Sequence, residues 1–234
     1  MPTILAVDTS TDACSVALLK NRQVIEKHTL TPRQHTQKLL PLIDELLSEQ
    51  NVKLLDLDAI AYGRGPGSFT GLRICMGTVQ GLAYAAELPL IAVSTLETLA
   101  TGAQRLYRFP EGSHLLVALD ARMNEVYWAA YKIQQGQTTA ITEEFVMPPA
   151  KVIDVLEEFD IKNLHGIGSG WHYHDLKVLV PEQVIETINP MAVDILPLAE
   201  QAREAGLQVT AEQAQPIYLR DSVAWEKRKR IRGR

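Results

Sequence analysis

Short apolar runs separated by polar turns alternate along this chain with stretches of helical periodicity. Continuous apolar runs predict buried strands, and apolar residues three and four positions apart predict amphipathic helices. In the first half of the chain we predict strands over 3–7, 14–19, 24–30, 58–62 and 90–94. The predicted helices span 35–50, 68–86 and 95–106. Pro41 is expected to kink or restart the first helix, and Ser68 to cap the second.

The same order of elements begins again at residue 115. Strands over 115–120, 126–133 and 138–146 precede a helix that Pro148 opens, a strand over 164–167 and a glycine-bearing loop. Because this order occurs twice, about a hundred residues apart, the sequence predicts an α/β fold of two lobes with related topology. The predicted lobes are 1–106 and 107–226. The partner of a late helix over 190–206 is left open, and 227–234 is a basic tail.

Charge is unevenly distributed along the 234 residues. The chain has 23 basic and 28 acidic residues, but six of the basic ones lie in the last eight positions, so residues 1–226 carry a net charge of −11. The body is therefore a poor general binder of nucleic acid. The tail is either an ordinary solvated terminus or a contact for RNA phosphates. The candidates for that contact are Lys227, Arg228, Lys229 and Arg230.

Hydropathy and cysteine content limit the class of protein. No apolar run approaches the roughly 18 residues of a membrane span, and the first predicted strand leaves no room for a signal peptide. The two cysteines, Cys14 and Cys75, cannot form a disulfide framework, which favours a reducing cytoplasm. The 46% hydrophobic content is ordinary for a globular protein and excludes wholesale disorder.

Two strands that end in aspartate, at Asp8 and Asp120, suggest a cleft that could hold a metal-bound phosphate. A small-molecule kinase or ATPase using these two carboxylates is therefore an alternative function. However, neither turn has the glycine that lets backbone amides approach a phosphate, and Arg122 and Met123 are bulky. Capping of their own turns is the favoured role of both aspartates.

The glycine-rich stretch from Gly63 to Gly71 leads from a predicted strand into a predicted helix. Such a loop can bind an anion with its backbone amides, although its spacing matches neither a Walker loop nor a dinucleotide fingerprint. The alternative, which we favour, is a tight turn that needs glycine for its backbone. His172 and His174 could offer two imidazoles to a metal, but an H-x-H in a polar loop is common. We therefore expect no metal or other cofactor.

The helix over 68–86 carries Gly77, Gly81 and Ala85 on one stripe. Each glycine costs about 1 kcal/mol of helix propensity relative to alanine, so the stripe needs a reason, and close approach of another helix is the obvious one. The remaining residues of this helix are apolar nearly all round. This pattern predicts burial on both sides, either by the chain's own fold or by a partner.

Three segments of the chain together resemble the TsaB (YeaZ) family. They are Ile4–Ser10, the run Gly-Pro-Gly-Ser-Phe-Thr-Gly-Leu-Arg over 65–73, and the late Pro-Ile-Tyr-Leu-Arg over 216–220. The family is the accessory subunit of the bacterial machinery that makes threonylcarbamoyladenosine in tRNA. The resemblance implies a two-lobed actin/Hsp70-like (ASKHA) fold with duplicated βββαβα topology.

The resemblance also implies a scaffold without catalytic activity. The catalytic paralogue, TsaD, carries a metal-binding His-x-x-x-His motif, and Thr95 and Leu99 occupy the two histidine positions here. Family members bind TsaD, or a second copy of themselves, through helices of the first lobe, and the ATPase TsaE joins the complex nearby. Carried over by position, the residues expected at this interface are Leu39, Leu42, Ile43, Leu46, Leu72, Met76, Gly77, Val79, Gly81, Tyr84 and Ala85.

Overall fold

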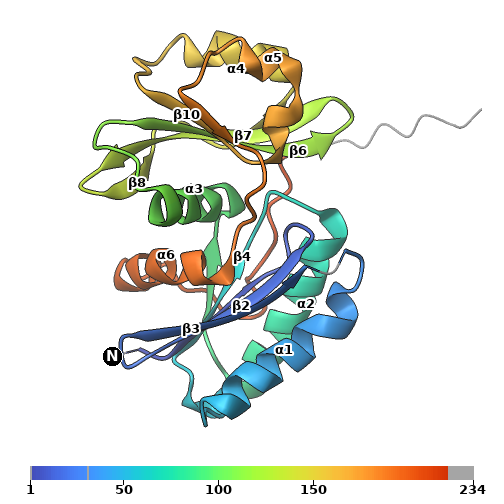
Figure 1. Ribbon diagram of the computed structural model, residues 1–234. Coiled ribbons are helices and arrows are strands. Elements are labelled where there is room, and N and C mark those ends of the chain that lie inside the picture. Colours follow the sequence, from blue (N-terminus) through green and yellow to red (C-terminus); the bar gives the residue numbers. More distant parts are fainter. Residues whose placement is uncertain (1, 31, 221–234) are drawn as a thin grey trace, which may run out of the picture.

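The first lobe is built on a five-stranded sheet. In the computed structural model, which describes residues 2–30 and 32–220, the strand order is β3-β2-β1-β4-β5 (Figure 1). β1, β2 and β3 are antiparallel, and β4 and β5 run parallel to β1. The strands are β1 (Ile4–Asp8), β2 (Ala13–Lys20), β3 (Gln23–Leu30), β4 (Ala59–Gly63) and β5 (Leu90–Val93).

The second lobe repeats this arrangement. Its sheet has the order β11-β10-β6-β7-β8, with β6 flanked by an antiparallel and a parallel strand as β1 is in the first lobe. A further strand, β9, also pairs with β7. The duplication predicted from the sequence is confirmed. The strands are β6 (His114–Arg122), β7 (Glu125–Gln134), β8 (Gln137–Ala140), β9 (Phe145–Met147), β10 (Leu164–Ile167) and β11 (Gln183–Ile185).

The prediction of one continuous strand over 138–146 is wrong, because residues 141–144 separate β8 from β9. Two side chains in this interruption make long-range interactions. The Thr142 hydroxyl accepts a hydrogen bond from the Ala130 amide at 2.9 Å. The Glu144 carboxylate turns towards the first lobe and pairs with Arg64 at 3.1 Å.

Helices cover both faces of each sheet (Figure 1). α1 and α2 pack on the outer face of the first sheet, α3 and α6 lie between the two sheets, and α4 and α5 cover the outer face of the second. α1 continues through Pro41 without interruption. The helices are α1 (His35–Glu49), α2 (Phe69–Ala86), α3 (Thr95–Tyr107), α4 (Pro149–Leu156), α5 (His174–Lys177) and α6 (Ala192–Glu204), with 3-10 turns η1 (Leu54–Asp56) and η2 (Ser169–His172).

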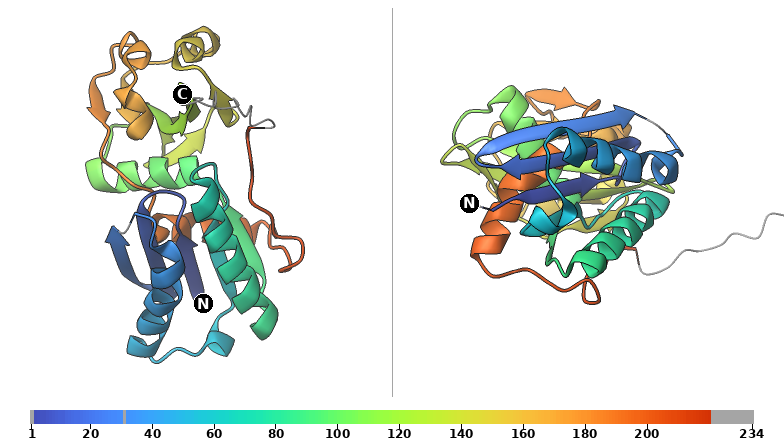
Figure 2. Two further views of the ribbon diagram at one scale, coloured as in Figure 1. Left: turned by 90° about the vertical axis from the view of Figure 1, so that its right-hand side faces the viewer. Right: turned by 90° about the horizontal axis from the view of Figure 1, so that it is seen from below.

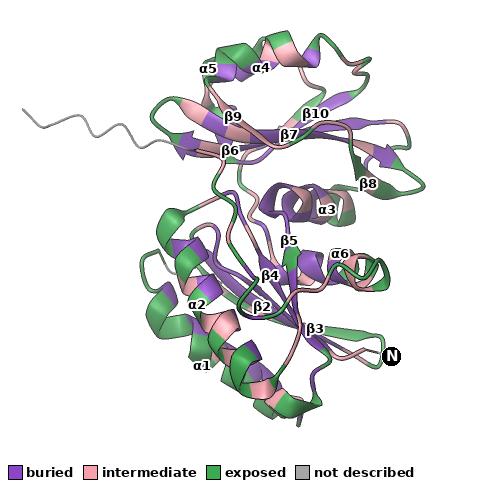
Figure 3. Ribbon diagram, turned by 180° about the vertical axis from the view of Figure 1, so that it is seen from behind, coloured by how far each residue is buried: buried purple, intermediate pink, exposed green. Residues whose placement is uncertain are grey.

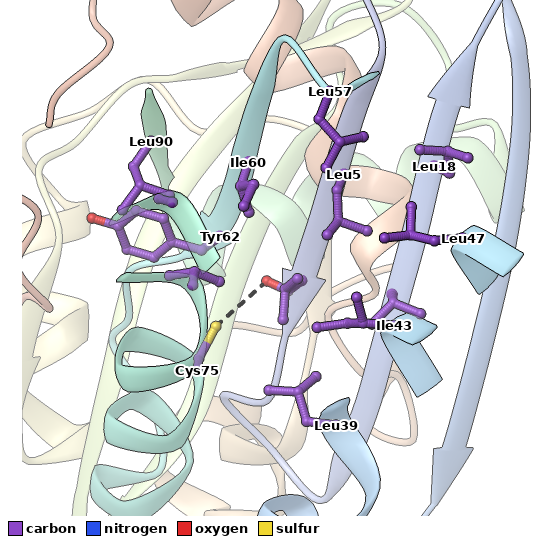
Figure 4. Close-up of a cluster of buried hydrophobic side chains, with 14 of the residues drawn as sticks. Leu5, Leu18, Leu39, Ile43, Leu47, Leu57, Ile60, Tyr62, Cys75 and Leu90 are labelled. Carbon is purple, nitrogen blue, oxygen red and sulfur yellow. Dashed lines mark hydrogen bonds between the residues drawn. The ribbon is translucent and has the colours of Figure 1, made fainter. Parts of the chain in front are cut away.

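The core beneath α1 and α2 is aliphatic and continuous with the sheet. Ile43 and Leu47 of α1 pack towards Leu5 and Leu18 of the strands, and Cys75 of α2 lies beside Tyr62 (Figure 4). The Cys75 thiol donates a weak hydrogen bond to the Val7 carbonyl oxygen at 3.7 Å. Both cysteines are buried free thiols. This core fixes the two helices on the sheet and leaves their opposite sides facing outwards.

Each lobe contributes one helix to the core of the other. The predicted boundary at residue 107 therefore does not coincide with the boundary between the two cores. α3 precedes that point, yet Leu96, Leu99 and Ala103 pack in the core of the second sheet. α6 follows it and packs on the first sheet through residues such as Ile195. The late helix predicted over 190–206 therefore belongs to the core of the first lobe. Arg105 and Asp194 join α3 to α6 with a hydrogen-bonded ion pair at 2.6 Å.

The C-terminal segment, residues 207–220, runs along the first lobe and ends on the second (Figure 2, left). Val209 bridges to Leu90 of β5, and Gln80 of α2 donates hydrogen bonds to the Ala211 and Ala214 carbonyl oxygens at 2.9 and 3.0 Å. At its end, the Arg220 guanidinium pairs with Glu125 of β7. The segment thus crosses from one lobe to the other. Among the described residues, no helix is long and apolar enough to cross a membrane.

Candidate functional site

Asp8, at the end of β1, is fully buried. Its Oδ1 accepts hydrogen bonds from the Ser10 amide at 2.9 Å and the Ser10 hydroxyl at 2.8 Å. Its Oδ2 has no hydrogen-bond partner among the described residues and lies against the backbone of Gly63. Burial raises the pKa of Asp8 to about 6, despite the opposing effect of the Ser10 hydrogen bonds. The carboxyl therefore closes its own turn, as the capping interpretation predicts.

Asp120, at the equivalent position on β6, also closes a turn. Its Oδ1 accepts hydrogen bonds from the Arg122 amide at 2.8 Å and the Tyr173 hydroxyl at 3.1 Å, and the Arg122 guanidinium lies 3.0 Å from Oδ2. Arg122, Met123 and Asn124 follow with positive φ angles of 62°, 58° and 57°. Non-glycine residues rarely adopt this conformation. The turn after Asp120 is therefore tight and carries large side chains, and it lacks the glycines that would let a phosphate approach its backbone amides.

A cleft of about 890 Å³ lies between the lobes. It is lined by residues from both, including Ser10, Phe69, Asp120, His172 and Arg220. Asp8 is not part of its lining because the carboxyl is buried beneath the turn. The two aspartates suggested as a pair consequently do not face the same space. No group of three metal-ligating side chains comes together within 2–30 and 32–220.

Glycines in the loop after β4 and in the first turn of α2 are needed for close packing. An ideal β-carbon at Gly67 would lie 2.6 Å from the Ser10 carbonyl oxygen, and one at Gly71 would overlap the Thr9 carbonyl oxygen. The Ser68 amide donates to the Ser10 carbonyl oxygen at 2.7 Å. The Ser68 hydroxyl accepts from the Gly71 amide at 3.2 Å, which confirms the predicted cap. These contacts favour the tight-turn interpretation of the loop over an anion site.

One face of α2 is open to solvent. Ideal β-carbons at Gly77 and Gly81 would meet nothing within 4 Å, and Tyr84 is 71% exposed. Ala85 is exposed beside them. Figure 3 shows this exposed side running along the helix. We call Gly77, Gly81, Tyr84 and Ala85 the open face of α2. The described chain therefore covers only one side of α2. Burial of the other side by a partner stays a prediction.

Most of the larger apolar side chains expected at an interface lie in the chain's own core. They pack between the helices and the sheet and are closed to a partner in this conformation; they are Leu39, Ile43, Leu46, Leu72, Met76 and Val79. Leu42 is partly buried against the same core. Leu40 and Phe69 are exposed as well, although neither was among the predicted interface residues. The spacing of apolar residues along each helix could have distinguished the side chains that face the sheet from those that face solvent.

The remaining candidates do not form a second site in the described structure. Thr95 and Leu99 are buried on α3. His172 donates a hydrogen bond from Nδ1 to the Ser169 carbonyl oxygen, 2.6 Å away, and its ring packs against that of Tyr173. His174 starts the short helix α5. Lys227, Arg228, Lys229 and Arg230 lie outside the described residues.

Two lobes of matching strand order, with paired helices between the sheets, define the ASKHA-like class of folds. The family model described as "TsaD: tRNA N6-adenosine threonylcarbamoyltransferase" matches residues 24–227. The tRNA threonylcarbamoyladenosine biosynthesis protein TsaB of Escherichia coli is 44% identical, over 96% of this chain and 97% of that one. The Haemophilus influenzae protein of the same name is 37% identical, over 96% of each.

A solved structure of YeaZ from Pseudomonas aeruginosa superposes with a TM-score of 0.87 at 45% identity, covering 94% of this chain and all of that one. The chain belongs to the TsaB (YeaZ) family.

Proposed function

We propose that this protein is a non-catalytic subunit of tRNA threonylcarbamoyladenosine biosynthesis. In this role it binds a TsaD-type transferase and supports transfer of the threonylcarbamoyl group to adenosine in tRNA. Membership of the TsaB family supports the involvement in this modification. Two free, buried cysteines are compatible with action in the cytoplasm.

The observation that carries the proposal is the open face of α2. Gly77 and Gly81 each reduce helix propensity by about 1 kcal/mol relative to alanine. Unlike Gly71, neither is required by packing within the chain, since a β-carbon at either would meet open space. A helix of the partner approaching to backbone distance explains both glycines, because side chains would hold the two helices apart. Tyr84 adds an exposed aromatic anchor of the kind enriched in interfaces.

The geometry of the aspartates supports a role without bond chemistry. A phosphate-transfer enzyme needs its carboxylates in the cleft, whereas Asp8 is buried and Asp120 is engaged by Arg122 and Tyr173. No observation favours the kinase or ATPase alternative, and ATP turnover that is lost in Asp8→Asn would revive it. As a scaffold, the subunit would act by binding one conformation of TsaD more tightly than another.

The test of the proposal is Gly81→Arg, which the open space at this position accommodates. The variant should unfold at the same temperature as the parent yet lose affinity for the cognate TsaD-type subunit by at least tenfold. The matched control is Gln201→Arg, which makes the same charge change at an exposed position of α6. Unchanged partner affinity in Gly81→Arg would reject this interface, and so would equal losses in both variants.

The same face predicts self-association when the partner is absent, because an exposed apolar stripe favours a symmetric dimer. Sedimentation should give a dimer for the parent and a monomer for Gly81→Arg.

Contact with a TsaE-type ATPase through the complex also belongs to the proposal. For the basic tail, removal of 227–234 should flatten the salt dependence of tRNA binding if Lys227–Arg230 contact phosphates.

A further inference from the structure

Two exposed aromatic rings and an arginine gather where α2 meets the C-terminal segment. The ring centroids of Phe69 and Tyr218 are 5.6 Å apart, with the planes tilted by 43°. The Arg73 guanidinium lies 3.4 Å from the Phe69 centroid and 5.7 Å from that of Tyr218. Phe69 is 54% exposed and Tyr218 41% exposed, and Arg73 is exposed beside them. We call these three residues the aromatic–arginine cluster.

All three side chains of the cluster are exposed, so both the aromatic rings and the charge of Arg73 can be reached from solvent. Among the described residues, no carboxylate lies within 4.0 Å of the Arg73 guanidinium. A guanidinium stacked on a ring keeps its N–H groups free at the edge, where they can donate to phosphate or base oxygens. Backbone contacts anchor the Tyr218 side, since the Ile217 amide donates to the Arg64 carbonyl oxygen at 2.8 Å. The rings are therefore held in place while each side chain stays partly exposed.

Exposed rings beside a guanidinium that pairs with no described carboxylate favour RNA over a protein as the ligand of the cluster. Phe69 lies on the rim of the interlobe cleft, which Arg220 also lines. Residues 227–234, which begin seven positions after Arg220 in the sequence, include six basic residues. Aromatic rings combined with cations bind unpaired nucleotides, with bases on the rings and phosphates near the cations. The net charge of −11 on residues 1–226 would confine such binding to this part of the surface.

We propose that Phe69, Arg73 and Tyr218 form a stacking platform for an unpaired base of the tRNA on which the complex acts. The platform rests on the proposed function, because it requires tRNA to reach the assembled complex. Stacking on a ring is tolerant of base identity, so the platform adds affinity and orientation and leaves sequence recognition to other groups. It would position the RNA beside the first lobe.

The experiment measures binding of an unmodified tRNA transcript to the complex of this protein with its TsaD-type partner. Phe69→Leu and Tyr218→Leu keep apolar side chains but remove the aromatic faces, and each should weaken binding about tenfold. Tyr218→Phe should restore parental affinity. The matched control is Tyr107→Leu, which changes a tyrosine of similar exposure, 45%, on α3. It should leave tRNA binding unchanged.

Salt dependence separates stacking from phosphate contact. In Phe69→Leu, the slope of log affinity against log salt should equal that of the parent, whereas removal of 227–234 should reduce it. Affinity for the partner subunit is measured in parallel, so that failure of the platform is distinguished from failure of the scaffold role. Three results would overturn the platform: unchanged tRNA affinity in both leucine variants, an equal loss in Tyr107→Leu, or loss of partner binding, which would make the cluster a protein contact.

Discussion

Gly71 lies directly against the main-chain carbonyl of Thr9, and the Thr9 hydroxyl donates to the Gly71 carbonyl oxygen at 2.8 Å. This reciprocal contact joins the first turn of α2 to the turn after β1. It also explains the glycine in chemical terms, because a β-carbon at this position would overlap the carbonyl oxygen. The helix that carries the open face is thereby held on the sheet at its N-terminal end.

Gly71→Ala should destabilise the protein by about 2 kcal/mol or more, because either α2 or the Thr9 turn must shift to accept the methyl group. Urea unfolding followed by circular dichroism measures this change. Gly77→Ala is the control on the same helix, since its methyl group would enter open space. Because alanine has the higher helix propensity, Gly77→Ala should not destabilise the chain, and equal destabilisation by the two variants would contradict the role given to the Thr9 contact.

The double variant Gly77→Ala and Gly81→Ala should separate folding from function. It should raise the free energy of unfolding of the isolated chain by about 1 kcal/mol or more through helix propensity. Affinity for the TsaD-type subunit should fall, because two methyl groups would hold the helices apart. Calorimetric titration measures the affinity, and urea unfolding measures the stability. A stabilised variant that bound its partner as tightly as the parent would contradict the role given to the glycines.

Asp8→Asn should change the pH dependence of stability. The pKa of Asp8 is about 6 in the folded protein, against 3.8 for the free side chain, because burial disfavours the charged form. Between pH 4 and 6 the unfolded chain releases this proton while the folded protein keeps it, so the free energy of unfolding falls as pH rises. Above pH 6 the loss is complete, and it amounts to about 3 kcal/mol for a shift of this size.

Asparagine cannot ionise, so the stability of Asp8→Asn relative to the parent should increase across this window and then level off. Urea unfolding at a series of pH values from 4 to 8 measures the difference. The adjacent Asp12→Asn, for an aspartate on the exposed rim of the cleft, serves as the control. A difference between Asp8→Asn and the parent that stayed constant with pH would contradict the assigned pKa.

The ion pair between Arg64 and Glu144 should couple the two lobes. Both terminal guanidinium nitrogens donate to the carboxylate, at 3.3 and 3.1 Å, and both side chains are largely buried. A double-mutant cycle with Arg64→Met and Glu144→Gln should give a coupling energy of about 1 kcal/mol, weaker at high salt. Additive effects of the two substitutions, with no coupling, would mean that the pair contributes nothing to holding the lobes together.

Local sequence patterns predicted the elements of this fold well. The strand runs, the cap at Ser68 and the repeat beginning at residue 115 all depend on neighbouring residues, and the structure contains each of them. Local patterns could not predict the interruption between β8 and β9, because Glu144 in this interruption pairs with Arg64, which lies 80 positions earlier in the sequence. Long-range partners of this kind leave no periodic signal.

The candidate site was predicted only in part for the same reason. Glycine spacing identified Gly77 and Gly81, and the structure has open space at both. Apolar character alone could not separate Tyr84, which is exposed, from Val79, which is buried one turn away. The aromatic–arginine cluster was missed because it joins Phe69 to Tyr218, nearly 150 positions apart in the sequence.

The exchange of α3 and α6 between the lobes has a consequence for synthesis of the protein. One face of the first sheet is covered by α6, whose last residue is Glu204. While the nascent chain leaves the ribosome, that face stays bare until α6 has been translated. Cotranslational folding of the N-terminal half is therefore incomplete until that point, and during this interval its uncovered strands are prone to aggregate.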